Sequence, residues 1–484
     1  MLEALRKFFE VFGASTVVPM MIFIVSLFLK VNPRKAFFSA LRAGVGLTGF
    51  GWIISSFAPM VTTYIQQMVK TTGLNLPIVD IGWQAGSLTA FSSEIGLSFF
   101  VFGLLIELVL FLVGITRVFV PSNLWNNFGY MIWGTMAYAA TGNFVLSFAF
   151  MVFVLLYSLI MSEVVADRWS DYYGVKNATI NSIHNIETLV PALILDPLWN
   201  LLGVNKVKLN PESLKKKLGI FGEPMTLGFI LGLIIGILGS LKHLTDVDTW
   251  GGILTFAIAL AAVMTIFPLI TGVFASAFSP LAEAVERNKK KESEAEEAGN
   301  LDKKRWFIAV DDGVGFGEPA TIIAGLILVP IMVVVALLLP GNQALPVVDL
   351  IAIPFMIEAM IAVSKGNILK AILNGVIWFS LGLYAASSLG PIYTDAVKQF
   401  GAALPAGVAM IMSFNLLAHP LTALVFFAWI SGNPLWIGAT IVIYLIFLFF
   451  LRTKRESIYA YLRRMADKNS GYEGSSDKIF IGEE

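Results

Sequence analysis

The chain has 484 residues, of which 57% are hydrophobic and 14% are charged, whereas soluble globular proteins carry about 25% charged residues. The apolar residues form continuous runs instead of alternating patterns. We therefore predict an all-α integral membrane protein whose spanning elements are helices. Its 33 basic and 33 acidic residues balance, so the charge gives no reason to expect a nucleic-acid partner.

The chain contains no cysteine and three histidines. Disulfides, thiolate metal sites and a phospho-cysteine within this chain are thereby excluded, and we expect neither a metal site nor a cofactor. The first apolar run, 12–29, is expected to remain as a first span instead of being cleaved as a signal.

Apolar segments follow one another along the chain, and together they predict about eleven spans plus one or two re-entrant segments. The segments lie at 12–29, 44–60, 96–115, 126–140, 146–161, 224–241, 251–278, 319–339, 348–363, 371–387, 407–430 and 436–451. Residues 72–95 contain no Lys or Arg and include Trp83 and Gln84, which indicates an extracytoplasmic loop or a re-entrant segment. Residues 44–51 are glycine-rich, which suits either close helix packing or a helix that bends.

The distribution of Lys and Arg predicts the orientation of the chain in the cell inner (plasma) membrane. Basic residues gather at 30–42, at 204–217, in the charged hinge at 287–305 and in the tail at 452–484. We place these segments in the cytoplasm and the N-terminus outside, with lipid around a single membrane domain that covers 1–484.

One short pattern occurs twice and opens a long apolar run each time. Phe221-Gly222-Glu223-Pro224 precedes one run, and Phe316-Gly317-Glu318-Pro319 precedes another. Proline suits the first position of a helix, and a carboxylate beside it would lie at the positive helix end. Two such starts suggest broken helices around a buried polar site in a transporter with repeated halves. The alternative is that each pattern is only a capping signal.

Ionisable residues inside apolar segments are the other candidates for function. His184 and Glu187 share a helix face because they are three residues apart, and they lie in a segment, 177–200, that prolines interrupt. Glu107 stands in the middle of the span at 96–115. For Glu107 a structural pair, for example with Arg117, is the expected role.

Several blocks in the same order resemble the IIC component of a phosphoenolpyruvate-dependent sugar phosphotransferase system (PTS), most closely the galactitol type within the ascorbate–galactitol group. They are Val79-Asp80-Ile81-Gly82-Trp83, Gly203-Val204-Asn205-Lys206, Phe221-Gly222-Glu223-Pro224, Gly232-Leu233-Ile234-Ile235-Gly236, and Pro340-Gly341-Asn342-Gln343 followed by Asp349. The second Glu-Pro pattern and Asn185-Ile186-Glu187 are more acidic than in typical galactitol members.

The resemblance implies a homodimeric permease with an inverted repeat, a dimerising scaffold and a mobile core that holds the sugar. It also implies IIB and IIA phosphotransferase proteins as partners, with IIB phosphorylating the sugar at the cytoplasmic face. The missing cysteine fits this arrangement, since the phospho-cysteine belongs to IIB in this type.

A neutral sugar or polyol needs hydrogen-bonding groups that replace water, and often an aromatic face. We expect His184 to act as a catalytic base that Glu187 orients, or to bond the reacting hydroxyl. The expected substrate-binding residues are Glu223, Glu318, Glu187, His184, Gln343, His419, Gln84 and Trp83. Each histidine could instead be an interhelical packing residue, and Asp349 could merely cap a helix.

Two other functions remain open from the sequence. An ion-coupled secondary transporter would use Glu223, Glu318 and Glu187 as proton or sodium ligands. A membrane receptor would sense the sugar without moving it, although no signalling domain is recognisable in the sequence. Dependence of uptake on phosphorylated IIB or on an ion gradient distinguishes these functions.

Overall fold

The computed structural model describes residues 14–28, 30–72, 76–120, 124–207, 209, 224–277, 280, 306–346, 348–400 and 409–470. These residues are mostly helical, which confirms the helical membrane class. Within them, five helices are long and apolar enough to cross a membrane, and three shorter apolar helices accompany them. The larger count of about eleven spans stays a prediction.

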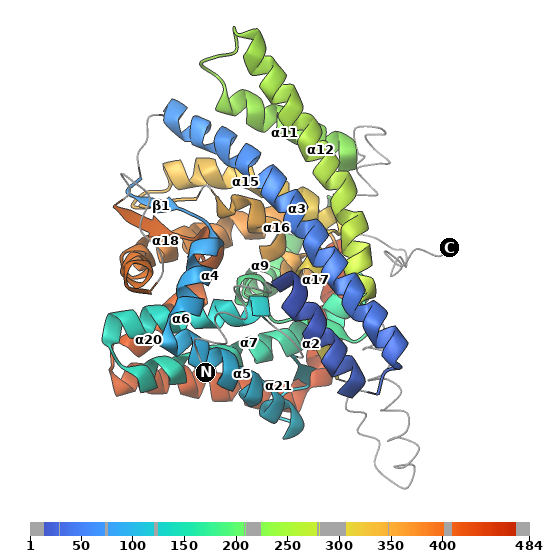
Figure 1. The fold of residues 1–484 in the computed structure, drawn as a ribbon, viewed down its shortest axis with the longest axis vertical. Helices are drawn as coiled ribbons and strands as arrows, with labels where there is room; N and C mark the ends of the chain where they lie inside the picture. Colours follow the sequence, from blue (N-terminus) through green and yellow to red (C-terminus); the bar gives the residue numbers. More distant parts are fainter. Residues whose placement is uncertain are drawn as a thin grey trace.

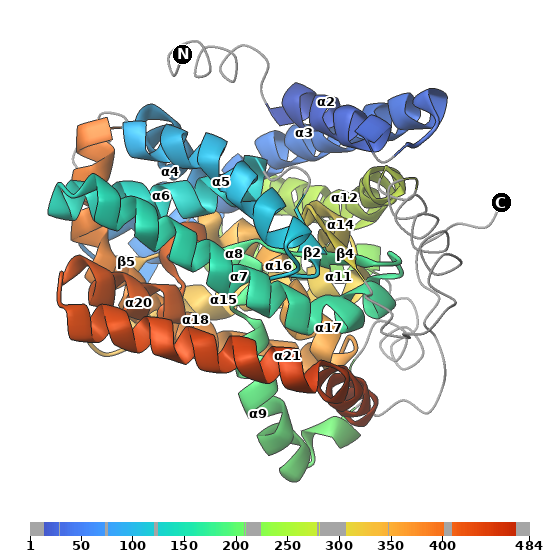
Figure 2. The same cartoon turned by 90° about the horizontal axis from the view of Figure 1, so that it is seen from below.

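Two helical hairpins pack against each other on one side of the molecule (Figures 1 and 2). They consist of α2 (Ala14–Phe28) with α3 (Pro33–Thr72), and α11 (Pro224–Gly239) with α12 (Val247–Ser276). Helices α11 and α12 approach each other closely at Gly232. A Cβ at that position would lie only 2.5 Å from the Ala257 Cα. Small residues permit such contacts between membrane helices.

The remaining described residues form a core from two segments of chain. The first comprises β1 (Ile78–Asp80), α4 (Trp83–Ser92), α5 (Glu94–Leu112), β2 (Val118–Phe119), α6 (Leu124–Thr141), α7 (Phe144–Tyr173), β3 (Ala178–Ile180), α8 (Ile183–Ile186), α9 (Leu189–Leu201) and the 3₁₀ turn η1 (Val204–Lys206). The second comprises β4 (Phe307–Val310), α14 (Gly313–Phe316), α15 (Pro319–Leu338), β5 (Ala344–Leu345), η3 (Asp349–Ala352), α16 (Ile353–Met356), α17 (Glu358–Ser364), α18 (Ile368–Phe400), β6 (Met410–Met412), α19 (Phe414–Leu417), α20 (Pro420–Ile430) and α21 (Pro434–Ser470).

Short strands occur in this core, which corrects the expectation of helices alone. They form two parallel three-stranded sheets, in the orders β5-β1-β6 and β2-β4-β3. The register pairs Val79 with Leu345 and Ile411 in one sheet, and Ile308 with Phe119 and Ala178 in the other. Extended backbone buried away from water must pair its N–H and C=O groups, and each sheet provides those partners.

The central strand of each sheet comes from the segment that does not supply its two neighbours. Strand β1 of the first segment lies between β5 and β6, and strand β4 of the second lies between β2 and β3. Helix α5 connects β1 to the sheet of β4, whereas α15 connects β4 to the sheet of β1. The two segments are therefore interleaved and do not form side-by-side domains.

Several predicted segments differ in length from the helices that form. The runs at 126–140 and 146–161 correspond to α6 and to the longer α7, and the run at 348–363 is broken into η3, α16 and α17. Helix α21 continues from the last apolar run into the polar tail, with a kink at Lys454. The charged hinge at 287–305 lies outside the described residues.

Candidate functional site

Four strand ends bring polar residues into the interior of the core. Strands β1, β3, β4 and β6 are each followed within three residues by a short helix and then by a longer one. Neighbouring parallel strands end at the same edge of their sheet, so the residues that follow them meet. Broken segments of this kind are tolerated at membrane depth only inside protein or beside a cavity.

His184 lies in direct contact with Asp312. Strands β3 and β4 pair Ile180 with Val310, which brings the residues that follow them together. The Nε2 atom of His184 contacts Oδ2 of Asp312, with side chains 14% and 9% exposed. The Ser182 hydroxyl donates to the same oxygen over 3.5 Å. The carboxylate that orients His184 is therefore Asp312.

Glu187, which we expected to orient His184, is engaged elsewhere. Its carboxylate accepts hydrogen bonds from the Thr422 amide at 2.8 Å and the Leu421 amide at 3.3 Å, and also from the Thr422 hydroxyl. Those amides open α20, so Glu187 caps a helix of the other segment.

His419 is the residue before α20 and is buried beside His184. Its Nε2 atom lies 2.7 Å from the Asn415 carbonyl oxygen, and its ring centroid lies 6.5 Å from that of Trp133. A carbonyl oxygen can only accept, so Nε2 of the His419 imidazole carries a proton and donates it to Asn415.

Glu318 caps the helix that its Glu-Pro pattern begins. Its two carboxylate oxygens accept from the Ala320 amide at 3.0 Å and the Thr321 amide at 2.8 Å, and the Thr321 hydroxyl donates at 2.8 Å. The side chain is 6% exposed. These bonds are those that a capping signal requires. The other copy of the pattern, with Glu223, lies outside the described residues.

Two buried polar atoms near the His184–Asp312 pair lack hydrogen-bond partners in the described part of the chain. They are Nδ2 of Asn185 and Oε1 of Glu358, and the Asn185 side chain lies close enough to the Glu358 carboxyl to interact with it. Oε2 of Glu358 accepts from the Trp169 indole at 3.2 Å. A Cβ at Gly315 would lie 2.2 Å from that oxygen, so only glycine lets α14 approach Glu358 this closely.

The other sheet carries two buried carboxylates that bind backbone amides. Asp80 accepts from the Gly82 and Asp349 amides at 3.0 and 2.8 Å. Asp349 accepts from the amides of Trp83 and Asn415 at 2.9 and 3.1 Å, and from the Ser413 hydroxyl. These bonds join β1, η3 and the turn after β6, so Asp349 does more than cap one helix.

The remaining predicted residues are distributed over this second sheet. Trp83 is half-buried and begins α4 at the carboxyl end of β1. Gln84 follows it, and its side chain is outside the described part of the structure. Gln343 is exposed and precedes β5, and its carbonyl accepts from the Ile78 amide at 3.1 Å. Because the strands are parallel, Gln343 and Trp83 lie at opposite edges of the sheet.

Asp312 and Glu358 were missing from the predicted site, although a second internal repeat could have indicated the first. Val79-Asp80-Ile81-Gly82 and Val310-Asp311-Asp312-Gly313 share the pattern Val-Asp-x-Gly. In both copies the first Asp accepts from the Gly amide, at 3.0 Å for Gly82 and 2.8 Å for Gly313. This turn needs Asp and Gly at fixed spacing. Glu358 had no comparable signal.

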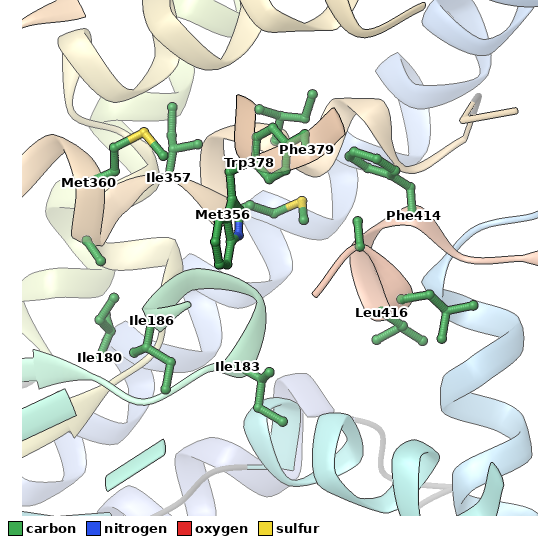
Figure 3. Packing of buried hydrophobic residues seen from close by; sticks show 14 of the residues in the cluster. Ile180, Ile183, Ile186, Met356, Ile357, Met360, Trp378, Phe379, Phe414 and Leu416 are labelled. Atoms are coloured by element: carbon green, nitrogen blue, oxygen red, sulfur yellow. The ribbon is translucent and has the colours of Figure 1, made fainter. Parts of the chain in front are cut away.

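Buried apolar side chains of the same elements pack together in the core (Figure 3). Trp378 of α18 and Met356 of α16 lie between the segment with Ile183 and Ile186 and the turn with Phe414. The Trp378 indole nitrogen is buried and has no hydrogen-bond partner among the described residues. An indole offers both an aromatic face and one donor, which suits the C–H and O–H surfaces of a sugar.

The sequence of this chain is similar to those of known proteins. Residues 7–407 match the family model described as PTS system sugar-specific permease component. The galactitol-specific EIIC components of the PTS from Escherichia coli K12 and O157:H7 are each 28% identical over 425 residues, which cover 87% of this chain and 89% of the relative. A putative permease IIC component of E. coli K12 is 24% identical over 405 residues, covering 84% and 89%. The chain thus belongs to the sugar-specific permease components of the PTS and is a multi-pass protein of the inner membrane.

Proposed function

We propose that this permease carries a neutral polyol, galactitol or a close relative, and presents it to a phosphorylated IIB protein that IIA recharges. The names of the E. coli relatives support a polyol. The observation that carries the proposal is the His184–Asp312 pair beside Asn185 Nδ2 and Glu358 Oε1, which are buried without hydrogen-bond partners among the described residues. A hydroxyl can accept from the amide and donate to the carboxylate, so polyol hydroxyls match both groups.

The same contact suggests how the reacting hydroxyl is activated. Asp312 holds Nε2 of His184, which leaves Nδ1 as the base that removes the hydroxyl proton. The hydroxyl oxygen then forms a bond to phosphorus while the bond from phosphorus to the IIB cysteine sulfur breaks. The proton passes from His184 to the departing thiolate. Asp312 acts as a positioning residue, and Glu187 and Glu318 stabilise helix starts around the site.

We also propose that the two core segments are inverted repeats, with about eleven crossings and two re-entrant segments. Support comes from the exchange of β1 and β4 and from the opposite directions in which α5 and α15 connect the sheets. The re-entrant segments would be β3-α8-α9 and β6-α19-α20. This path gives an external N-terminus and a cytoplasmic C-terminus. Labelling of cysteines introduced at each terminus of intact cells checks the orientation.

The two helical hairpins, α2 with α3 and α11 with α12, are the proposed homodimer contact. Helices α2 and α3 carry large apolar side chains that the single chain leaves open, including Ile24 at 64% and Val45 at 55% exposure. A second copy or lipid can cover them. One chain per particle in lipid nanodiscs, measured by mass, would contradict the dimer.

The function is tested by uptake of labelled galactitol and a panel of pentitols and hexitols into vesicles. Each polyol is supplied with and without phosphorylated IIB, and with an ion gradient imposed or collapsed. We expect phosphorylated product only with phosphorylated IIB. Unmodified polyol accumulating on a gradient alone would identify an ion-coupled transporter, and binding without uptake would identify a receptor.

The positioning of the His184 base is tested with Asp312→Asn. We expect phosphorylation to fall by about 10²–10⁴-fold, the usual contribution of acid–base groups, while polyol binding changes less. The matched control is Asp246→Asn, since Asp246 lies between α11 and α12 with its side chain 62% exposed. Equal loss of binding and of phosphorylation in Asp312→Asn would rule out the positioning role.

A further inference from the structure

Two short segments of the core follow the same plan. The first, 182–186, and the second, 413–417, each consist of a serine and a four-residue helix, α8 or α19, and we call them the two tips. In both, the serine carbonyl accepts from the amide four residues further on, at 2.9 Å in the first tip and 3.0 Å in the second. A longer helix, α9 or α20, begins seven residues after the serine. His184 and Asn415, each two residues after the serine, therefore occupy equivalent positions.

In each tip, one carboxylate oxygen binds both the serine and the residue two positions after it. Oδ2 of Asp312 accepts from the serine hydroxyl of the first tip over 3.5 Å and contacts Nε2 of His184. Oδ2 of Asp349 accepts from the serine hydroxyl of the second tip and, at 3.1 Å, from the Asn415 backbone amide. The two tips thus differ in one respect. His184 meets its carboxylate with the side chain, whereas Asn415 does so with the backbone, so the Asn415 side chain is not used in this contact.

The Asn415 side chain is buried and makes no hydrogen bond to the residues that the structure describes. The residue is only 5% exposed. Its backbone N–H is bound by Asp349, and its carbonyl oxygen lies 2.7 Å from Nε2 of His419. A side-chain amide offers two donors and one acceptor oxygen, and leaving such groups buried without partners is costly. A ligand rich in hydroxyl groups matches both kinds of atom.

The two tips lie against each other in the core. Glu187 directly follows the first tip, and its carboxylate accepts at 2.8 Å from the Thr422 amide of α20, the helix that follows the second tip. In Figure 3, Trp378 lies between Ile183 of the first tip and Phe414 of the second. The equivalent positions of the two tips therefore border one region of the core.

We propose that Asn415 is the counterpart of His184 for the unreacted part of the substrate and determines which polyols are accepted. This inference rests on the proposed polyol site. The Asn415 amide donates to one hydroxyl and accepts from its neighbour, while His184 takes the hydroxyl that reacts. An amide does not act as a base for a hydroxyl proton, so Asn415 contributes to binding and not to the chemical step. The first tip thus supplies the chemistry and the second supplies the selectivity.

The test measures dissociation constants with the solubilised full-length protein in the absence of IIB. Each polyol of the panel is compared with its deoxy analogues, each of which lacks one hydroxyl. We expect Asn415→Leu to reduce by about tenfold the preference for one or two adjacent hydroxyls and to keep the preference for the others. Asn415→Ala adds no atoms and should show the same pattern, which separates the lost hydrogen bonds from a clash. The matched control is Gln399→Leu, which removes an exposed carboxamide near the end of α18 and should bind like the wild type.

Phosphorylation kinetics give a second readout. With phosphorylated IIB, Asn415→Leu should raise KM about tenfold and leave kcat within about threefold of the wild type, whereas Asp312→Asn lowers kcat. Unchanged preferences in both Asn415 variants, or an equal loss of affinity for every analogue, would overturn the inference and leave the proposed function standing. A wild type that bound no polyol at all would refute the proposed function and this inference with it.

Discussion

Buried carboxylates in this core differ in how their oxygens are bound. Glu187 and Glu318 have their oxygens filled by helix-opening amides, whereas Glu358 keeps one oxygen without a partner in the described part of the chain. The sequence identifies Glu187 and Glu318 as unusual because they interrupt apolar runs, and it gives no signal for Glu358. It cannot show that Glu187 caps a helix, since the amides that bind its carboxylate belong to residues 421–422, far along the chain. Spacing within one helix is a local signal, but these partners are not local.

Helix α21 has two parts with different surroundings. Its first part exposes apolar side chains such as Leu435 and Phe449, at 81% and 70%, as expected of a helix that faces lipid. After the kink at Lys454, the helix packs Tyr459 against Phe307 of β4, with ring centroids 6.3 Å apart. Its Arg455 and Arg463 pair with Glu163 and Asp167 of α7.

Arg463 allows the attachment of this polar part to be measured. Its guanidinium donates to both oxygens of the buried Asp167, at 2.6 and 2.7 Å. Bidentate bonds to a carboxylate are stronger than neutral ones. We expect Arg463→Ala to accelerate proteolysis in 455–470 by roughly tenfold, or about 1.4 kcal/mol. The control is Arg464→Ala, since Arg464 is exposed and donates to Ala460 of its own helix. Equal cleavage of both variants would show that the ion pair does not hold the segment.

At the level of elements, the helices that arise from apolar runs were predictable from the sequence. The strands that pair with distant parts of the chain were not. The runs at 126–140 and 146–161 correspond to helices, because each forms its own hydrogen bonds. The strands are only two to four residues long, too short for a period-two pattern. Their partners lie far away in sequence, as Val79 and Leu345 do. The Asp312 contact depends on this pairing, and so it was not predictable from spacing.

At the scale of the whole molecule, the core consists of two interleaved segments that depend on each other. Each segment supplies the central strand of a sheet whose edges belong to the other, and Glu187 of the first caps α20 of the second. Neither segment can complete its backbone hydrogen bonds alone, which is costly where water is absent.

Separate expression of the two halves tests this interdependence. Dividing the chain within 287–305 interrupts no described helix or strand. Co-expressed halves should therefore assemble and transport, whereas either half alone should be degraded. Accumulation of a folded, protease-resistant first half on its own would contradict this interdependence. It would show that the first half folds without β4 and without β5 and β6, the neighbours of β1.

The exchanged strands also impose an order on biosynthesis. Strand β1 leaves the ribosome early, but its neighbours β5 and β6 begin at residues 344 and 410. At roughly 5–20 residues per second, the delay amounts to tens of seconds. During that time the nascent β1 has open edges inside a membrane, the condition that favours wrong pairing. The cell's insertion machinery must shelter this segment until translation is nearly complete, so yield should depend more on membrane chaperones than on the final stability of the protein.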